Sequence, residues 1–124
     1  MASSDVWDIV KVPFPYTNRP VQQHRPALVV ARQDQAGSPA LLWVLMITSA
    51  VHRRWSGDIA ISDVAMAGLP AASIVRSAKI ATIEGLEGGK IGCLPIADRA
   101  AVRGQIAGLL AAVLGEQGAS QESP

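Results

Sequence analysis

The fold of this chain is decided by the stretch Arg25-Pro26-Ala27-Leu28-Val29-Val30-Ala31 and the run Leu41-Leu42-Trp43-Val44-Leu45-Met46-Ile47-Thr48 that follows it. Both runs are apolar, and the turn-forming segment 34–39 separates them, so they predict a hairpin of two buried strands. If the turn is symmetric, opposed residues have numbers that sum to 73, which places Arg25 opposite Thr48. Opposed side chains lie about 5 Å apart on one face, so a guanidinium and a hydroxyl are expected together at the open end of the hairpin. A one-residue bulge would separate them.

Shorter strand signals surround this hairpin. The segment 9–12 is β-branched and ends at Pro13 and Pro15; because proline lacks an N–H and keeps the preceding residue extended, residues 13–24 are predicted as a loop. A short strand is expected at 58–61, and 73–76 followed by 80–83 predicts either one long strand or a pair. Turns are expected at 66–70 and 87–90.

A helical period replaces the strand pattern after residue 97. Asp98 is a plausible N-cap, and the helix glycines Gly104 and Gly108 each cost about 1 kcal/mol relative to alanine, which favours close packing on the sheet or on a partner. The apolar stripe consists of Val102, Ile106, Leu109, Leu110 and Val113. Five or so strands and one C-terminal helix predict a mainly β fold, a small curled antiparallel sheet or barrel. The expected organisation is a flexible N-terminus at 1–6, one domain at 7–115 and a disordered tail at 116–124.

Composition excludes several classes of protein. With 124 residues, 49% of them hydrophobic, the chain is long enough for one domain with its own core. A single cysteine, Cys93, excludes an internal disulfide and a four-cysteine metal site. Two histidines and the lack of a phosphate-binding glycine loop argue against a metal or nucleotide cofactor, so none is expected. The chain shows no secretory signal and no apolar run of about 18 residues, and a cytoplasmic protein without a membrane association is expected.

The formal net charge of +1 hides a polarised chain. Residues 11–79 hold eight of the eleven cations and three of the ten anions, a local excess of +5. Two segments of this region combine cations with aromatic rings, a pattern typical of single-stranded RNA binding. The first holds Tyr16 and Arg19, and the second holds Arg53, Arg54 and Trp55. The alternative is a solvated loop with Trp55 folded back onto the core.

Several blocks along the chain resemble the MazF/PemK toxin family. In chain order they are Asp8-Ile9-Val10-Lys11-Val12-Pro13-Phe14-Pro15-Tyr16-Thr17, His24-Arg25-Pro26-Ala27-Leu28-Val29-Val30, Ile47-Thr48-Ser49, Gly68-Leu69-Pro70, Ser73-Ile74-Val75-Arg76 and Lys79-Ile80-Ala81-Thr82-Ile83. They follow the order of the family and cover roughly residues 7–115. The resemblance implies an SH3-like barrel with a C-terminal helix and a homodimer. It also implies a growth-inhibiting toxin of a type II toxin–antitoxin system that acts as a metal-independent, sequence-specific endoribonuclease, an mRNA interferase.

The resemblance also assigns roles to residues. The active-site arginine of the family falls on Arg25, and its Thr/Ser at the end of the third strand falls on Thr48. Further catalytic candidates are Ser49, Arg76 and His24, and candidate RNA contacts are Tyr16, Arg19, Arg53, Arg54, Trp55 and Lys79. RNA cleavage in this family proceeds by attack of the 2′-OH on its own phosphate. The partners implied are single-stranded RNA and an antitoxin whose acidic C-terminal tail occupies the RNA groove, with DNA contacted only through that antitoxin.

The chain departs from one branch of the family. PemK-like members carry an aspartate base two residues after the arginine that matches Arg76, and Ala78 stands there; their histidine is replaced by Arg19. A glycine usually precedes the opening aspartate, where this chain has Trp7. The Arg-plus-Thr/Ser version of the site is therefore favoured, and His24 and His52 are the candidate bases. The alternative for each is an exposed loop histidine, and for His52 in particular that alternative is favoured. For Arg76, a structural ion pair is an equally good interpretation.

Two other functions stay open at this point. One is a CcdB-like gyrase poison, which shares the fold but acts by protein contact. The other is an SH3-like binding module without activity, an interpretation that the missing acid at Ala78 supports.

Overall fold

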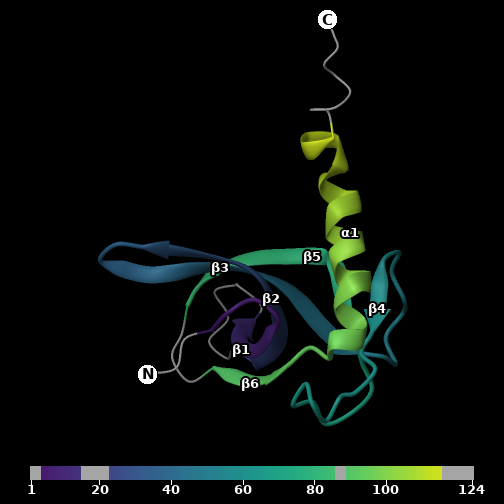
Figure 1. Cartoon of the computed structure of the whole chain (residues 1–124). Helices are drawn as coiled ribbons and strands as arrows, with labels where there is room; N and C mark the ends of the chain where they lie inside the picture. The colour runs from purple at the N-terminus through teal and green to yellow at the C-terminus, as the bar shows by residue number, and fades with distance from the viewer. Residues whose placement is uncertain (1–3, 15–22, 86–88, 116–124) are drawn as a thin grey trace, which may run out of the picture.

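The computed structural model of the chain describes residues 4–14, 23–85 and 89–115. These residues form the strands β1 (Asp8–Phe14), β2 (Gln23–Gln35), β3 (Ser38–Ser49), β4 (Asp58–Ala60), β5 (Ser73–Glu84) and β6 (Lys90–Cys93), followed by the helix α1 (Ile96–Leu114). All described strand pairs are antiparallel, in the order β4-β5-β3-β2-β1-β6. Among the described residues the sheet is not closed, since β4 and β6 are its edges, so the expected curled sheet is open rather than a closed barrel. The β2–β3 hairpin and α1 project from it in different directions (Figure 1).

The register of the β2–β3 hairpin is the predicted one near its open end. Ala27 lies opposite Met46 and Leu28 opposite Leu45, the register that the prediction extends to Arg25 and Thr48. Bulges between Val29 and Ala31 and between Gln33 and Gln35 shift the pairing by one residue and then restore it. Gly37 occupies the turn at φ +75°, a conformation that glycine adopts without strain.

Two apolar clusters occupy the two faces of the sheet, because alternate residues of a strand point to opposite sides. One cluster includes Leu28 and Leu45 and is covered by the start of α1 through Val102. The other, on the opposite face, includes Val29 and Val44. The strands are therefore buried on both faces near the middle of the hairpin, which fixes its position relative to the helix.

The helix begins at Ile96, after Pro95, so the prediction of Asp98 as its N-cap is wrong. Asp98 lies in the first turn and is buried, and its Oδ2 accepts hydrogen bonds from the N–H and the hydroxyl of Ser62 at 2.9 and 3.0 Å. The carboxylate is therefore used to attach the start of the helix to the segment after β4. Its negative charge also suits a helix N-terminus.

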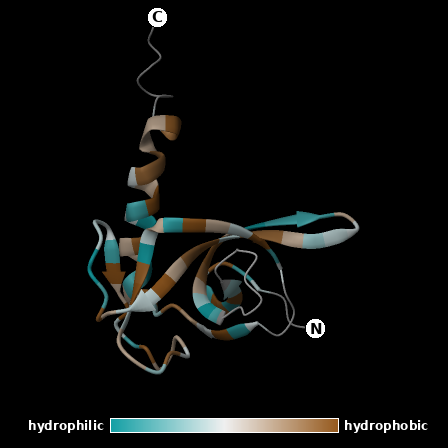
Figure 2. Cartoon of the chain, turned by 180° about the vertical axis from the view of Figure 1, so that it is seen from behind, coloured by the Kyte–Doolittle hydropathy of each residue, from teal (hydrophilic) through white to brown (hydrophobic). Residues whose placement is uncertain are grey.

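Beyond Ile106, which packs against the first cluster, α1 does not pack on the sheet, so its predicted apolar stripe is covered only in part. Val102 is buried, but Leu109 is 60% and Val113 is 75% exposed. A methyl group added at Gly104 or Gly108 would meet no atom within 4 Å. The helix extends away from the sheet (Figure 2), so of the two expected packing partners the sheet does not cover the residues beyond Ile106.

The strand β6 was not expected, because its four residues follow glycines and show no strand pattern. It pairs with β1 and lies tightly against the turn at 66–70, which forms as predicted. A Cβ on Gly92 would lie 2.3 Å from the carbonyl carbon of Ala67, and one on Gly68, at φ +76°, would lie 2.0 Å from the carbonyl oxygen of Ile91. The two glycines therefore permit this contact, which holds the turn beside the sheet.

The two segments 73–76 and 80–83 belong to one strand, β5, which bends between them. Met46 of β3 pairs with Arg76 while its neighbour Leu45 pairs with Ile80, so residues 77–79 form a bulge. The first half of β5 pairs with both β3 and β4, and the second half with β3 alone. The bulge thus sets Arg76 at the end of a straight segment, directly opposite Asp58 of β4. The predicted turn at 87–90 lies mostly outside the described residues.

Candidate active site

A cleft lies at the open end of the β2–β3 hairpin. Its volume is about 250 Å³, and Arg25, Thr48, Ser49 and His52 line it together with Leu69 and Pro70 of the turn beside β6. Its remaining lining is Pro26, Ile47, Ala71, Ala72 and Ser73. The two residues that the hairpin register places opposite each other are therefore brought into one cleft, as the sequence predicts.

Ser49 shapes the chain where it leaves β3. Its Oγ accepts a hydrogen bond of 3.3 Å from the N–H of Val51, and its carbonyl oxygen accepts one of 3.1 Å from the N–H of His52. The N–H of Ala50 donates to the carbonyl oxygen of Ala72 at 3.0 Å, which ties the turn to the opposite wall of the cleft. Serine favours such local turns because its hydroxyl bonds nearby backbone groups. These bonds bring His52 to the edge of the cleft.

The polar groups of the cleft differ in what they do chemically. The guanidinium of Arg25 carries a permanent positive charge and several donors in one plane, a geometry that suits two oxygens of a phosphate. The hydroxyls of Thr48 and Ser49 donate or accept single hydrogen bonds. Among the lining residues, His52 is the side chain of the type that exchanges a proton near neutral pH. The arrangement is able to hold a phosphate group and to transfer a proton beside it.

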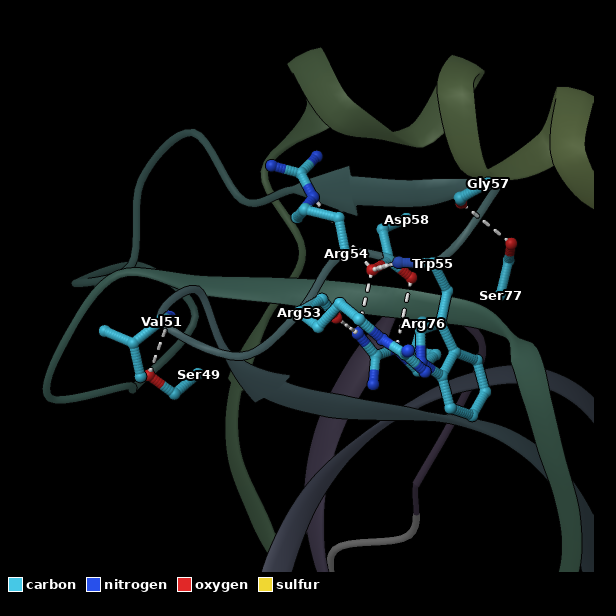
Figure 3. Close-up of polar contacts among 9 residues, drawn as sticks. All are labelled: Ser49, Val51, Arg53, Arg54, Trp55, Gly57, Asp58, Arg76 and Ser77. Carbon is cyan, nitrogen blue, oxygen red and sulfur yellow. Dashed lines mark hydrogen bonds and ion pairs between the residues drawn. The ribbon is translucent and has the colours of Figure 1, made fainter.

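Arg76 lies outside this cleft and forms a buried ion pair. Its Nε donates to Oδ1 of Asp58 at 3.2 Å and its Nη2 to Oδ2 at 3.0 Å, while Nη2 also donates to the carbonyl oxygen of Arg53 at 2.6 Å. Its guanidinium carbon lies 4.1 Å from the centre of the Trp55 ring. Figure 3 shows these groups gathered around the guanidinium. Of the two interpretations of Arg76, the contacts support the structural ion pair.

Asp58 is a poor candidate for the base that the chain lacks at position 78. Burial raises the pKa of Asp58, but hydrogen bonds from Arg76 and from the N–H of Trp55, with the charges of Arg76 and Arg54, outweigh burial and hold the pKa below its usual value of 3.8. An ionised carboxylate with such a low pKa accepts a proton poorly at neutral pH. Ala78 itself is exposed in the β5 bulge and carries no acid, so the three-residue constellation of the PemK-like branch is incomplete here.

The remaining predicted site residues lie around the cleft rather than in it. Arg53 and Arg54 are exposed, and Nε of Arg54 is 4.0 Å from Oδ2 of Asp58. Trp55 folds back over Arg76 rather than onto the apolar core of the alternative interpretation, and it stays 39% exposed. His24 is exposed and does not line the cleft, because adjacent residues of β2 point to opposite faces.

Three further predicted contacts lie elsewhere. Lys79 is exposed in the β5 bulge and is not part of the cleft lining. Tyr16 and Arg19 lie outside the described residues.

Sequence reasoning missed two features of the site. The first is the wall formed by Leu69 and Pro70, whose position depends on the contact between Gly68 and β6. The second is Asp58 as the partner of Arg76. The sequence does place Asp58 at the start of a predicted strand, but the pairing of that strand with the one that carries Arg76 was not predicted. In the part of the chain that the structure describes, no three His, Cys, Asp or Glu residues come together as a metal site. No helix there is long and apolar enough to cross a membrane.

Comparison with known proteins identifies the family. The family profile for PemK-like, MazF-like toxins of type II toxin–antitoxin systems matches residues 5–110. No curated protein matches the chain in a sequence search. The matched span contains every described strand, the cleft and most of α1. The chain therefore belongs to the PemK-like, MazF-like toxin family of type II toxin–antitoxin systems.

Proposed function

We propose that this toxin is a sequence-specific endoribonuclease that cleaves single-stranded RNA, including mRNA, without a metal ion. The observation that supports this most is the meeting of Arg25 and Thr48 in one cleft, beside Ser49 and His52. A cation, hydroxyls and a proton-exchanging imidazole are the groups that phosphodiester cleavage by an internal nucleophile requires. The cytoplasm is where such a toxin meets mRNA.

The reaction needs no bound cofactor because the RNA supplies its own nucleophile. The 2′-oxygen forms a bond to the adjacent phosphorus, and the bond from phosphorus to the 5′-oxygen breaks, which leaves a 2′,3′-cyclic phosphate and a 5′-OH. We assign the acceptor of the 2′-OH proton to His52, and water supplies a proton to the departing 5′-oxygen. Arg25 stabilises the extra negative charge on the phosphate, and Thr48 donates a hydrogen bond to a phosphate oxygen.

A second copy of the chain is the proposed partner of the uncovered apolar surface. Trp43, Ile80, Leu109 and Leu110 line a groove of about 490 Å³ between β3, β5 and α1, and Trp43 is 47% exposed. Exposed apolar surface of this kind is typical of protein interfaces. Family membership implies a cognate antitoxin; we propose that its acidic tail competes with RNA for the cleft and that DNA is contacted only through the antitoxin.

Cleavage of RNA by the purified protein in EDTA tests the function. We expect products with 5′-OH and 2′,3′-cyclic phosphate ends, and a loss of activity of about 100-fold or more in Arg25→Ala, the size found when one donor to a transition-state oxygen is removed. Gln33→Ala, on the exposed part of β2, is the matched control and should cut normally. The same folded state by circular dichroism in both variants shows that the loss is not one of structure.

Other outcomes separate the alternatives. Unchanged cutting by Arg25→Ala removes that residue from the mechanism. Growth arrest with intact cellular RNA, relieved by a gyrase mutation, supports a CcdB-like poison, and expression without growth arrest supports an inactive binding module. If His52→Ala loses RNA cleavage and added imidazole restores it, the assignment of His52 as the base is supported. If cleavage is lost in His24→Ala alone, the base is His24 instead.

A further inference from the structure

The chain between β3 and β4, residues 50–57, forms a loop that hydrogen bonds attach at several points. We call it the Arg-Trp loop. At its start, the N–H of Ala50 bonds the carbonyl oxygen of Ala72 at 3.0 Å, and at its end the hydroxyl of Ser77 donates to the carbonyl oxygen of Gly57 at 2.9 Å. Its middle carries the exposed side chains of Arg53 and Arg54. His52, at the cleft, is part of the same loop.

The middle of the Arg-Trp loop is attached to the sheet through one ion pair. Nη2 of Arg76 donates to the carbonyl oxygen of Arg53 at 2.6 Å, and the Trp55 ring lies over the guanidinium. Asp58 binds both sides of this junction, because its Oδ2 accepts from Nη2 of Arg76 at 3.0 Å and from the N–H of Trp55 at 2.8 Å. The N–H of Asp58 in turn donates to the carbonyl oxygen of Trp55 at 3.2 Å. Figure 3 shows the ion pair between Asp58 of β4 and Arg76 of β5, beside the loop.

Arg76 is badly placed to touch RNA directly. The side chain is 10% exposed, and its Nε and Nη2 are both engaged within the protein. If the guanidinium turned outward, it would leave the carboxylate of Asp58, which is 1% exposed, buried without its main partner. Unpaired buried charges are strongly disfavoured. The guanidinium therefore stays where it is when a ligand reaches the cleft.

We propose that Arg76 and Asp58 are positioning residues, which fix the Arg-Trp loop so that His52 and the cations beside it are ordered before RNA binds. This inference rests on the proposed function. A preordered loop loses little conformational entropy on binding, so the pair acts on substrate affinity. The proposed role differs from direct catalysis, because both members of the pair are needed and neither would contact the reacting phosphate.

Limited proteolysis tests the attachment without reference to RNA. Trypsin cuts after arginine, and Arg53 and Arg54 lie in the loop. We expect cleavage after these residues to be at least about tenfold faster in Arg76→Gln and in Asp58→Asn, since hydrogen bonds to charged groups are worth more than that factor. Arg32→Gln is the matched control, because it breaks an arginine–aspartate pair far from the loop, Arg32–Asp34 in the projecting hairpin. Cleavage at wild-type rates in both loop variants overturns the proposal.

RNA kinetics then separate a positioning role from a catalytic one. We expect KM to rise by roughly tenfold in Arg76→Gln and in Asp58→Asn, with a smaller change in kcat, and the double variant to be no worse than either single one. Arg76→Lys keeps the charge and should recover part of the affinity. Normal KM in Asp58→Asn with strong loss of kcat in Arg76→Gln would show that Arg76 acts on RNA directly.

Two controls keep these outcomes interpretable. Circular dichroism identifies a variant that fails to fold, and Arg76→Lys then carries both assays as the milder change. If the wild-type protein cuts no RNA, the proposed function fails while the protease result still decides whether the ion pair holds the loop.

Discussion

At position 7, where the chain has Trp7, a glycine variant is expected to be more stable than an alanine variant. Its φ is +79°, in the left-handed region, and a residue with a Cβ loses about 1–2 kcal/mol there. The ring offsets this strain because it packs against the apolar cluster below α1 and lies 5.5 and 5.7 Å from the guanidinium carbons of Arg99 and Arg103. Each such cation–π contact is worth about 0.5–1 kcal/mol.

The two substitutions at this position have different costs. Trp7→Ala loses the ring contacts and keeps the backbone strain, so we expect the free energy of unfolding to fall by roughly 2–3 kcal/mol, less than for a fully buried tryptophan. Trp7→Gly loses the same contacts but relieves the strain, while its more flexible unfolded chain takes back about 0.4–1 kcal/mol. The glycine variant should therefore be more stable than the alanine variant by about 0.5–1 kcal/mol.

Urea denaturation followed by far-ultraviolet circular dichroism measures this difference, because that signal does not depend on the tryptophan that is removed. The matched control is Trp43, in the extended strand β3, where Trp43→Gly should be less stable than Trp43→Ala. If Trp7→Ala is as stable as Trp7→Gly, the argument from backbone strain is refuted.

Three further changes test other parts of the molecule. The carboxyl pKa of Asp58 is lowered in the folded state, so its ion pair stabilises the fold at pH values above the ordinary pKa of 3.8, and this stabilisation is lost as the pH falls through the lowered pKa. The urea midpoints of the wild type and of Asp58→Asn should therefore converge in acid. A difference between the midpoints that widens in acid contradicts this. Gly92→Ala should lower the free energy of unfolding by about 1–3 kcal/mol, because its Cβ meets the Ala67 carbonyl at 2.3 Å, whereas Gly104→Ala, in open space, should raise it by roughly 1 kcal/mol. Leu110→Lys should turn a dimer into a monomer by light scattering, and an unchanged mass would locate the interface elsewhere.

The hairpin and its site were predictable because their signals are local. Two apolar runs around Gly37 determine both the turn and the register, and from the register follows the meeting of Arg25 and Thr48. The prediction assumed no bulge, yet the hairpin contains two; the register near the open end is the predicted one because one extra residue lies in β3 and the other in β2, so the two shifts cancel. A single bulge would have placed the two side chains on opposite faces.

The pairing around Arg76 was not predictable because it depends on contacts distant in sequence. The ion pair forms since β4 lies beside β5 in a register that sets Asp58 opposite Arg76, eighteen residues away. The helix illustrates the same limit. Its period is visible in the sequence, but whether Leu109 and Val113 pack on the sheet depends on the angle at which α1 leaves it, and here they stay exposed.

The absence of an acid at position 78 and the ion pair between Arg76 and Asp58 both argue against a catalytic role for Arg76. An arginine at this position still has a carboxylate beside it, but the carboxylate comes from β4, is buried and has a lowered pKa. Such a carboxylate holds the guanidinium in place and takes up a proton poorly. The proposed proton transfer is therefore assigned to the cleft, where His52 lies with Arg25. The Arg-Trp loop joins the two sides, because the same eight residues carry the histidine and receive the hydrogen bond from Arg76. On the proposal made above, the arginine that matches a PemK-like active-site residue orders a loop in this chain instead of acting on the RNA.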